Sequence, residues 1–254
     1  MTKKIYSVLL LVAVCFCALL SCTKSSVTSS DPTLNYFPLT LGKYVTYNVD
    51  SIYYYGSTCT QYEVKSQMKT VITDTFTDSK KRISYIMDVF TRPYEGGIWV
   101  HNNVIFITPT VTPPLTLSDP TTISLLYNAD QTQYVKMIFP VSNGYSWAGN
   151  KYAVTQDSMF TYLKDWVYSY QNYHMSYNNG YINFDNTVTV SEDNESVNYP
   201  NVDSSINAYR TFAREVYAYN VGMVYKEWTH WTYKPWLVTC KNGYSVVMQA
   251  IDHN

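Results

Sequence analysis

The sequence predicts an all-β protein, an antiparallel meander that forms a curved half-barrel or a sandwich with few short helices. Apolar and polar side chains alternate along many segments, as they do in strands with one buried face. The chain of 254 residues holds 27 tyrosines, a residue type that favours pleated, half-buried surfaces. No strand-like segment alternates with a helix of ordinary length, and this argues against a parallel sheet.

The first strands are predicted from two-residue alternation. Residues 44–55, 58–77 and 83–89 are each expected to form one strand. Within residues 99–108, the pair Asn102-Asn103 predicts a tight hairpin turn, because Asn tolerates positive φ. Residues 109–132 contain four prolines, which remove ladder donors, so we expect a loop, an edge or a flap there.

The second half of the chain repeats this alternation. Residues 158–177 are expected to form a strand pair, or a short helix near 159–166. Residues 193–205 are polar, and we expect a mobile loop. The remaining strands are expected at 135–139, 184–191, 208–219, 223–233 and 243–252.

The N-terminal segment has the pattern of a lipoprotein signal peptide. Lys3 and Lys4 precede an apolar run that ends at Leu20, which is shorter than the roughly 20 residues of a membrane-spanning helix. Leu19-Leu20-Ser21-Cys22 resembles the lipobox of bacterial lipoproteins. We therefore expect residues 1–21 to be removed and Cys22 to carry fatty acyl chains through a thioether. An ordinary secretory signal cleaved elsewhere and a retained membrane helix are the alternatives.

The following residues predict the place of the protein in the cell. Residues 22–34 are small and polar and are expected to form a lipidated flexible tether, followed by a single all-β domain over 35–254. Lys24 stands where an inner-membrane retention signal would have Asp, which favours the outer membrane and leaves the leaflet open. Cleavage before Cys22 would change the formal net charge from −1 to −3. This mildly acidic balance argues against a nucleic-acid partner.

The cysteines outside the N-terminal segment form an even pair. Cys15 and Cys17 would leave with the signal peptide and Cys22 would take lipid, so Cys59 and Cys240 remain. In an oxidising compartment we predict that these two form a disulfide. Two separate buried thiols are the alternative.

Two similar hexads suggest an internal duplication. Phe37-Pro-Leu-Thr-Leu-Gly42 is similar to Phe139-Pro-Val-Ser-Asn-Gly144, and aromatic-rich sequence follows each. The alternative is a recurrent way to begin a strand, with Pro fixing φ and Gly turning the chain.

Longer blocks carry a family resemblance. They begin with Tyr36-Phe-Pro-Leu-Thr-Leu-Gly42, and the others are 139–150, 215–227 and Ile251-Asp-His-Asn254. These blocks resemble a family of uncharacterised Gram-negative envelope lipoproteins, and one of them is similar to all-β envelope proteins built like the lipoprotein-carrier half-barrel. The resemblance implies a fold and an envelope location, and it implies no activity.

Residue patterns for catalysis are weak. Glu227 and His230 are imaginable as an acid–base dyad, but alternation along a strand would point them to opposite faces. The acidic residues Asp185, Glu192, Asp193 and Glu195 are expected in a solvated polar loop, without the spacing of an EF-hand. The chain has no Gly-x-Ser-x-Gly elbow, no glycine-rich phosphate loop and no metal-spaced histidine pair. We therefore assign no catalytic, cofactor or metal residue.

Two functional hypotheses follow. The first is a non-catalytic, membrane-anchored envelope lipoprotein whose β scaffold binds an apolar, lipid-like or glycan ligand, with the oligomeric state open. The second is an envelope glycan hydrolase with paired carboxylates. A deep apolar groove would favour a lipid-like ligand, a row of exposed aromatic side chains would favour a glycan, and two carboxylates facing each other in a cleft would favour the hydrolase.

Overall fold

The pairing of the strands defines one antiparallel sheet of twelve strands. The computed structural model describes residues 32–94, 96–110, 121–127, 132–153, 160–200, 202–237 and 240–254. Residues 31–254 cluster as one unit, separate from residues 1–30. The expected signal peptide, Cys22 and most of the expected tether lie outside the described residues.

The strands account for most of the described chain, so the all-β prediction is confirmed. The two short 3-10 helices are η1 (Pro32–Tyr36) and η2 (Thr161–Leu163). The strands are β1 (Tyr44–Tyr55), β2 (Thr60–Thr77), β3 (Ile83–Pro93), β4 (Val100–Thr110), β5 (Thr121–Tyr127), β6 (Gln133–Phe139), β7 (Ser146–Ala148), β8 (Val167–Asn178), β9 (Asn183–Val197), β10 (Ala208–Ala218), β11 (Gly222–Tyr233) and β12 (Asn242–His253).

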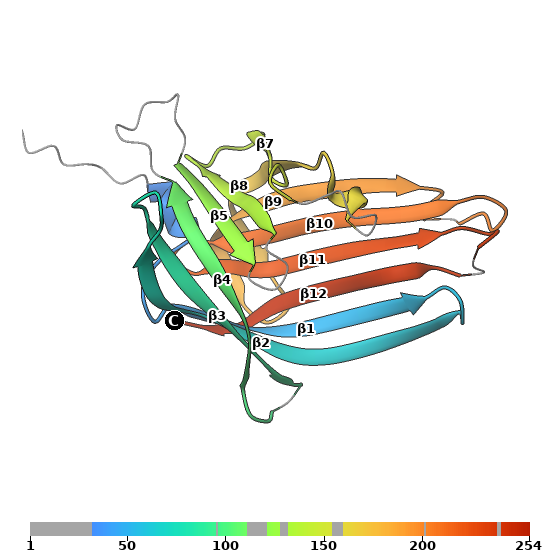
Figure 1. The fold of residues 1–254 in the computed structure, drawn as a ribbon, viewed down its shortest axis with the longest axis horizontal. Coiled ribbons are helices and arrows are strands. Elements are labelled where there is room, and N and C mark those ends of the chain that lie inside the picture. Colours follow the sequence, from blue (N-terminus) through green and yellow to red (C-terminus); the bar gives the residue numbers. More distant parts are fainter. Residues whose placement is uncertain are drawn as a thin grey trace, which may run out of the picture. The chain divides into compact units, whose positions relative to one another are not determined.

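The sheet is an up-and-down meander that curves until it is nearly closed. Strands β1 to β6 pair in sequence, strands β7 to β12 do the same, and β1 joins the two halves by pairing with β12. This ladder runs from Val45 opposite His253 to Tyr54 opposite Gly243. Figure 1 shows β1, β2 and β9 to β12 as long neighbouring strands, with β3 and β4 crossing them steeply. The fold is therefore the curved form of the prediction, and the sandwich does not form.

A seam between β6 and β7 stands where a twelfth ladder would close the sheet. Backbone contacts across it include the Val135 amide donating to the Gly149 carbonyl at 2.9 Å, and a bridge from Gln133 to Tyr152. Side chains supply further bonds. The Tyr170 hydroxyl lies 2.9 Å from the Ile138 amide nitrogen and 2.8 Å from its carbonyl oxygen. The polar edge of β6 is thus satisfied largely by side chains, as a buried edge requires.

The main core lies on the concave side of the curved sheet. Alternation along each strand sends every second side chain inward, where apolar burial stabilises the fold. Several strands contribute buried residues to this cluster, among them Ile72, Val89, Ile105, Ile107, Ile123, Leu125, Met137, Tyr168, Val188 and Tyr217.

The hairpin between β8 and β9 packs against β11 and β12 through its turn. Asn179 is 2 % exposed, and its side-chain amide donates to the carbonyls of Val224 and Ala250 at 3.1 Å and 2.8 Å. The turn at 178–180 therefore fixes this hairpin against the neighbouring strands.

The short helix η1 closes one end of the domain. Tyr36 is fully buried, and its ring makes edge contacts with Tyr173 and Tyr219. Thr33 accepts a hydrogen bond from the Val141 amide, and Leu34 packs on the main core. The expected boundary between tether and domain, at residue 35, therefore falls inside this helix.

Two loops at the other end of the long strands are joined by a disulfide between Cys59 and Cys240. The first loop connects β1 to β2 and the second connects β11 to β12. These loops are adjacent because β1 pairs with β12. The bridge therefore ties together segments that the sheet already brings side by side.

Three local predictions are wrong. Asn102-Asn103 makes no hairpin turn, because β4 continues through it with a register shift next to β3. Residues 121–127 form β5 inside the stretch expected to be a loop. Residues 193–197 belong to β9 rather than to a mobile loop, because they pair with β10. Within 158–177, where a strand pair or a short helix near 159–166 was expected, the short helix η2 forms and β8 follows it.

We predict that Tyr170→Phe destabilises the domain by about 2 to 4 kcal/mol, because the buried amide and carbonyl of Ile138 lose their partner. Urea unfolding followed by tryptophan fluorescence measures the change. Tyr181→Phe is the matched control, since Tyr181 is 54 % exposed, and it should change stability by less than about 0.5 kcal/mol. Equal stability of the two variants would contradict the role given to the Tyr170 hydroxyl.

Candidate functional site

Four charged side chains meet in the interior of the sheet. They are Lys136 on β6, Glu192 on β9, Glu215 on β10 and Lys226 on β11, and we call them the charge cluster. Lys136 is 2 % exposed, and the two glutamates are 1 % exposed each. Charges are seldom buried without partners, because desolvation is costly. This cluster is therefore the first candidate for a functional site.

The charge cluster is fully connected around Glu215. Its Oε1 accepts hydrogen bonds from the Nζ atoms of Lys136 and Lys226, each at 2.9 Å. Its Oε2 accepts one from the Tyr217 hydroxyl at 2.6 Å. Lys136 also donates to Oε1 of Glu192.

Two β-bulges turn charged side chains inward. The β5–β6 register passes from Ile123 opposite Met137 to Ser124 opposite Val135, so Lys136 is the extra residue. Between β9 and β10, Asp193 pairs with Ala213 and Ser191 with Arg214, so Glu192 is the extra residue. A bulge interrupts strict alternation and re-aims a side chain. Lys226 needs no bulge, because it lies directly opposite Glu215.

The two glutamates have opposite pKa shifts. Burial, followed by the charge of Glu215, raises the pKa of Glu192. Burial would also raise the pKa of Glu215, but Lys136, Lys226 and the Tyr217 hydroxyl outweigh it and lower this pKa. The Oε2 atom of Glu192 is buried without a hydrogen-bond partner. Of the two carboxyl groups, Glu192 is therefore the one whose neutral form is favoured, and Glu215 the one whose ionised form is favoured.

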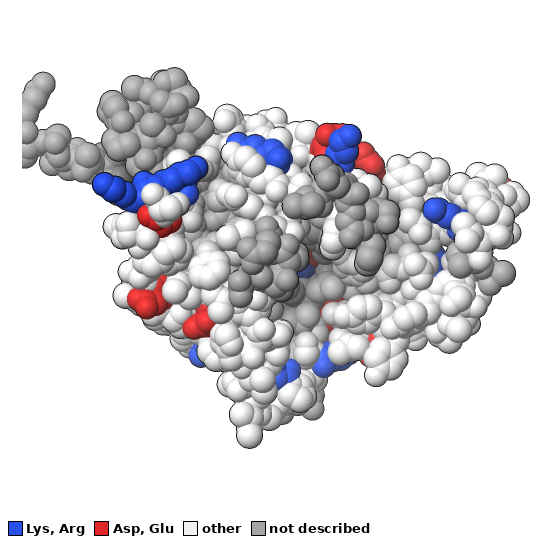
Figure 2. Space-filling view, in the orientation of Figure 1, with Lys and Arg blue, Asp and Glu red and all other residues white. Residues whose placement is uncertain are grey.

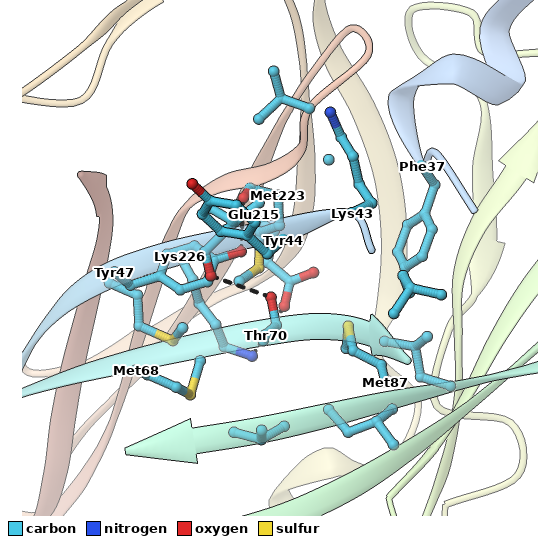
Figure 3. Close-up of a pocket in the computed structure, with 18 of the residues that line it drawn as sticks. Phe37, Lys43, Tyr44, Tyr47, Met68, Thr70, Met87, Glu215, Met223 and Lys226 are labelled. Carbon is cyan, nitrogen blue, oxygen red and sulfur yellow. Dashed lines mark hydrogen bonds and ion pairs between the residues drawn. The ribbon is translucent and has the colours of Figure 1, made fainter. Parts of the chain in front are cut away.

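A cavity of about 320 Å³ lies beside the charge cluster. Most of its wall is apolar, and Figure 3 shows Phe37, Tyr47, Met68 and Met87 around the space that Glu215 and Lys226 also reach. The full lining is Phe37, Pro38, Lys43, Tyr44, Val45, Tyr47, Met68, Thr70, Ile72, Met87, Val89, Asn102, Asn103, Ile105, Leu125, Glu215, Tyr217, Val221, Gly222, Met223, Lys226 and Met248. We call this space the apolar cavity.

A second cavity, of about 290 Å³, is lined by Tyr134, Lys136, Phe160, Tyr162, Leu163, Lys226, Trp228, Tyr244 and Val246. Lys226 contributes to the walls of both cavities. The charge cluster thus supplies charged groups to the wall of each cavity. In contrast, charged residues on the surface in Figure 2 are sparse and of mixed sign.

The structure does not form the imagined dyad of Glu227 and His230. Glu227 pairs with Arg214 at 3.0 Å. His230 stacks on the Tyr162 ring with a centroid distance of 3.7 Å and contacts the Thr211 hydroxyl. Burial lowers the pKa of His230 to about 4, so its ring is neutral near pH 7. Glu227 therefore forms an ion pair and His230 forms a stacking contact, and the two side chains do not pair with each other.

The expected acidic loop is wrong, because Asp185, Glu192, Asp193 and Glu195 all lie on strand β9. Glu192 is buried inside the sheet. Asp193 is partly buried, and burial, followed by the charge of Glu195, raises its pKa to about 6. Within the described ranges, no group of three or more His, Cys, Asp or Glu side chains is arranged to hold a metal ion. One sequence signal could have located Lys136, since it is the only charged residue in the apolar run Val135–Phe139.

The paired carboxylates do not leave room for a glycosidic bond. Glycosidases keep roughly 5 to 10 Å between two carboxyl groups so that sugar or water fits between them. Here the Lys136 ammonium is bonded to both Glu192 and Glu215. A cation occupies the position that the substrate would need, and this argues against the hydrolase.

No protein-family model matches the chain. No curated protein matches it either. Among solved structures, a protein named as exported with a YmcC-like fold, from Bacteroides fragilis, is 10 % identical with a TM-score of 0.37, over 86 % of this chain and 98 % of its own. A protein named as a lipoprotein, from Parabacteroides distasonis, is 10 % identical with a TM-score of 0.34, over 86 % and 98 %.

A DUF1329 family protein from Desulfovibrio piger is 10 % identical with a TM-score of 0.19, over 87 % of this chain and 92 % of its own. Similarity at this level carries no argument about activity. In the described part of the chain, no helix has the length and apolar character needed to cross a membrane.

We predict that Lys136→Met destabilises the domain by about 3 to 5 kcal/mol, because it leaves buried carboxyl groups without their shared cation. Adding Glu192→Leu to this variant should recover part of the loss, since both members of a pair are then apolar. Lys65→Met is the control, because Lys65 pairs with Glu63 at the surface. Urea unfolding of the single and double variants gives the coupling energy, and additive losses would refute the pairing.

Proposed function

We propose that this protein is a lipid-anchored lipoprotein of the bacterial outer membrane that binds an apolar ligand inside its β-sheet, without catalysing a reaction. The observation that carries the ligand class is the apolar cavity. Its volume of about 320 Å³ lies within the range of small-molecule sites, roughly 300 to 1,000 Å³. The proposal leaves the leaflet and the oligomeric state open.

The lining of the cavity favours a lipid-like ligand over a glycan. Four methionines, Met68, Met87, Met223 and Met248, line it together with branched aliphatic residues. Methionine side chains are flexible and polarisable and adapt to ligands of irregular shape. A glycan would need hydrogen-bonding groups over most of the wall, whereas residues with such side chains are the minority here.

The position of the cavity fits an anchored protein. Phe37 and Pro38 line it, and they follow directly after helix η1. Cys22 lies ten residues before Pro32, and ten polar residues span roughly 18 Å as a flexible chain. A lipid attached at Cys22 would therefore hold this end of the domain near the membrane surface, where apolar ligands are concentrated.

We predict that Cys22→Ser moves the protein from the membrane fraction to the soluble fraction, because two or more acyl chains are needed for firm anchoring. Immunoblots of fractionated cells and the mass of the mature N-terminal peptide provide the measurement. Cys17→Ser, within the expected signal peptide, should leave fractionation unchanged. A wild-type protein without acyl mass on Cys22 would overturn the anchor.

We predict that the neutral fluorescent probe N-phenyl-1-naphthylamine binds the domain saturably, and that Val89→Phe weakens this binding roughly ten-fold. Val89 lines the apolar cavity and is 5 % exposed, so a larger side chain there takes ligand space. Val167→Phe makes the same change at a residue that is 61 % exposed, and it should bind like wild type. Circular dichroism verifies that both variants fold. Unchanged binding by a folded Val89→Phe protein would exclude the apolar cavity as the site.

A further inference from the structure

We propose that the ligand is a single-chain amphiphile with an anionic head group, a carboxylate or a phosphate, and that Lys226 holds this head group while the chain fills the apolar cavity. The inference rests on the proposed function, because it names the class of ligand for the same cavity. Its basis is the position and the pairing of the four residues of the charge cluster.

Within the charge cluster, Lys226 is the lysine that a cavity-bound head group can reach. Its side chain is 18 % exposed, whereas that of Lys136 is 3 % exposed. It reaches both cavities, and its ammonium lies over the Trp228 ring at 5.2 Å. An ammonium has three donors, so Lys226 can bond Glu215 and a ligand oxygen together.

The hydrogen bonding of Glu215 disfavours a cationic head group. Both of its oxygens already accept bonds, two at Oε1 and one at Oε2. A ligand ammonium would therefore meet a carboxylate that is already paired, next to two lysines that repel it. The group of this wall that lines both cavities is the Lys226 ammonium, which carries positive charge.

The charge balance points the same way. The cluster contains two lysines and two glutamates, and the buried Oε2 atom of Glu192 has no partner. The raised pKa of Glu192 favours its neutral form. With Glu192 protonated, the two lysines and the one ionised glutamate leave the cluster with one excess positive charge. A bound anion would compensate this excess in a site where solvent screens little.

A second lysine lines the apolar cavity and must be tested separately. Lys43 donates to the backbone carbonyl of Asn254, and burial lowers its pKa. This residue precedes β1, whereas Lys226 lies within β11 beside the charge cluster. The two lysines therefore offer two alternative positions for a head group, and the inference commits to Lys226.

The test compares ligands with the same chain and different head groups. Dodecanoate, dodecyl phosphate and dodecanol displace N-phenyl-1-naphthylamine from the full domain, each below its micelle concentration. We expect the wild type to bind at least one of the two anions roughly ten-fold more tightly than dodecanol, as a charge-assisted hydrogen bond implies. The tighter of the two anions identifies the head group.

The variants locate the recognition. Lys226→Met should abolish the preference for the anion and keep dodecanol binding within about two-fold, and Lys226→Arg should restore part of the preference. Lys80→Met, at an exposed turn, is the control. The carboxyl ¹³C signal of bound [1-¹³C]dodecanoate should titrate at lower pH in wild type than in Lys226→Met. This readout reports the local charge and not the stability of the fold.

The possible outcomes distinguish failure of the proposed function from failure of the anionic head group or of its assignment to Lys226. If no probe binds, the proposed function fails. If the probe and dodecanol bind and the anions bind no more tightly, the cavity stands and the anionic head group is overturned. If Lys43→Met abolishes the preference and Lys226→Met does not, the assignment to Lys226 is overturned.

Discussion

The pairing of β1 with β12 is the contact on which the rest of the structure depends. It joins the first and last strands of the meander, from Val45 opposite His253 onward, and turns two six-stranded halves into one nearly closed sheet. Closure creates an interior that is remote from water. Every polar group that points inward must then find a partner inside, because an unpaired buried charge destabilises the fold by several kcal/mol.

The charge cluster satisfies that requirement with side chains that strict alternation alone would not bring together. Bulges turn Lys136 and Glu192 inward, and the cross-strand pair of Glu215 and Lys226 completes the set. Buried ion networks seldom add net stability when compared with an apolar core of the same shape. Their retention beside two cavities is easier to explain by recognition than by stability. The same wall combines methionine and aliphatic groups with the ammonium of Lys226.

Sequence patterns located most strands because alternation is a local property. The hairpin of β1 and β2 and the strands β10 to β12 followed from two-residue periodicity and turn residues. Strand β5 was not predicted because the prolines around it suggested a loop. The inward position of Glu192 was not predicted because a bulge depends on the register with a neighbouring strand. The cavities could not be predicted from local patterns, because they form only when the sheet closes. The sequence alone therefore predicted the disulfide between Cys59 and Cys240, but it did not predict the candidate site.

The β1–β12 ladder also brings the last described residue next to the beginning of the domain. The Asn254 side chain accepts a hydrogen bond from the Tyr44 amide at 2.8 Å and donates one to the Gly42 carbonyl at 3.0 Å. Anything joined after Asn254, such as a fluorescent reporter or an affinity label, would start beside the residues through which the chain enters its first strand. It would be carried far from the disulfide-linked loops and would crowd the end of the domain where Phe37 and Lys43 border the cavity.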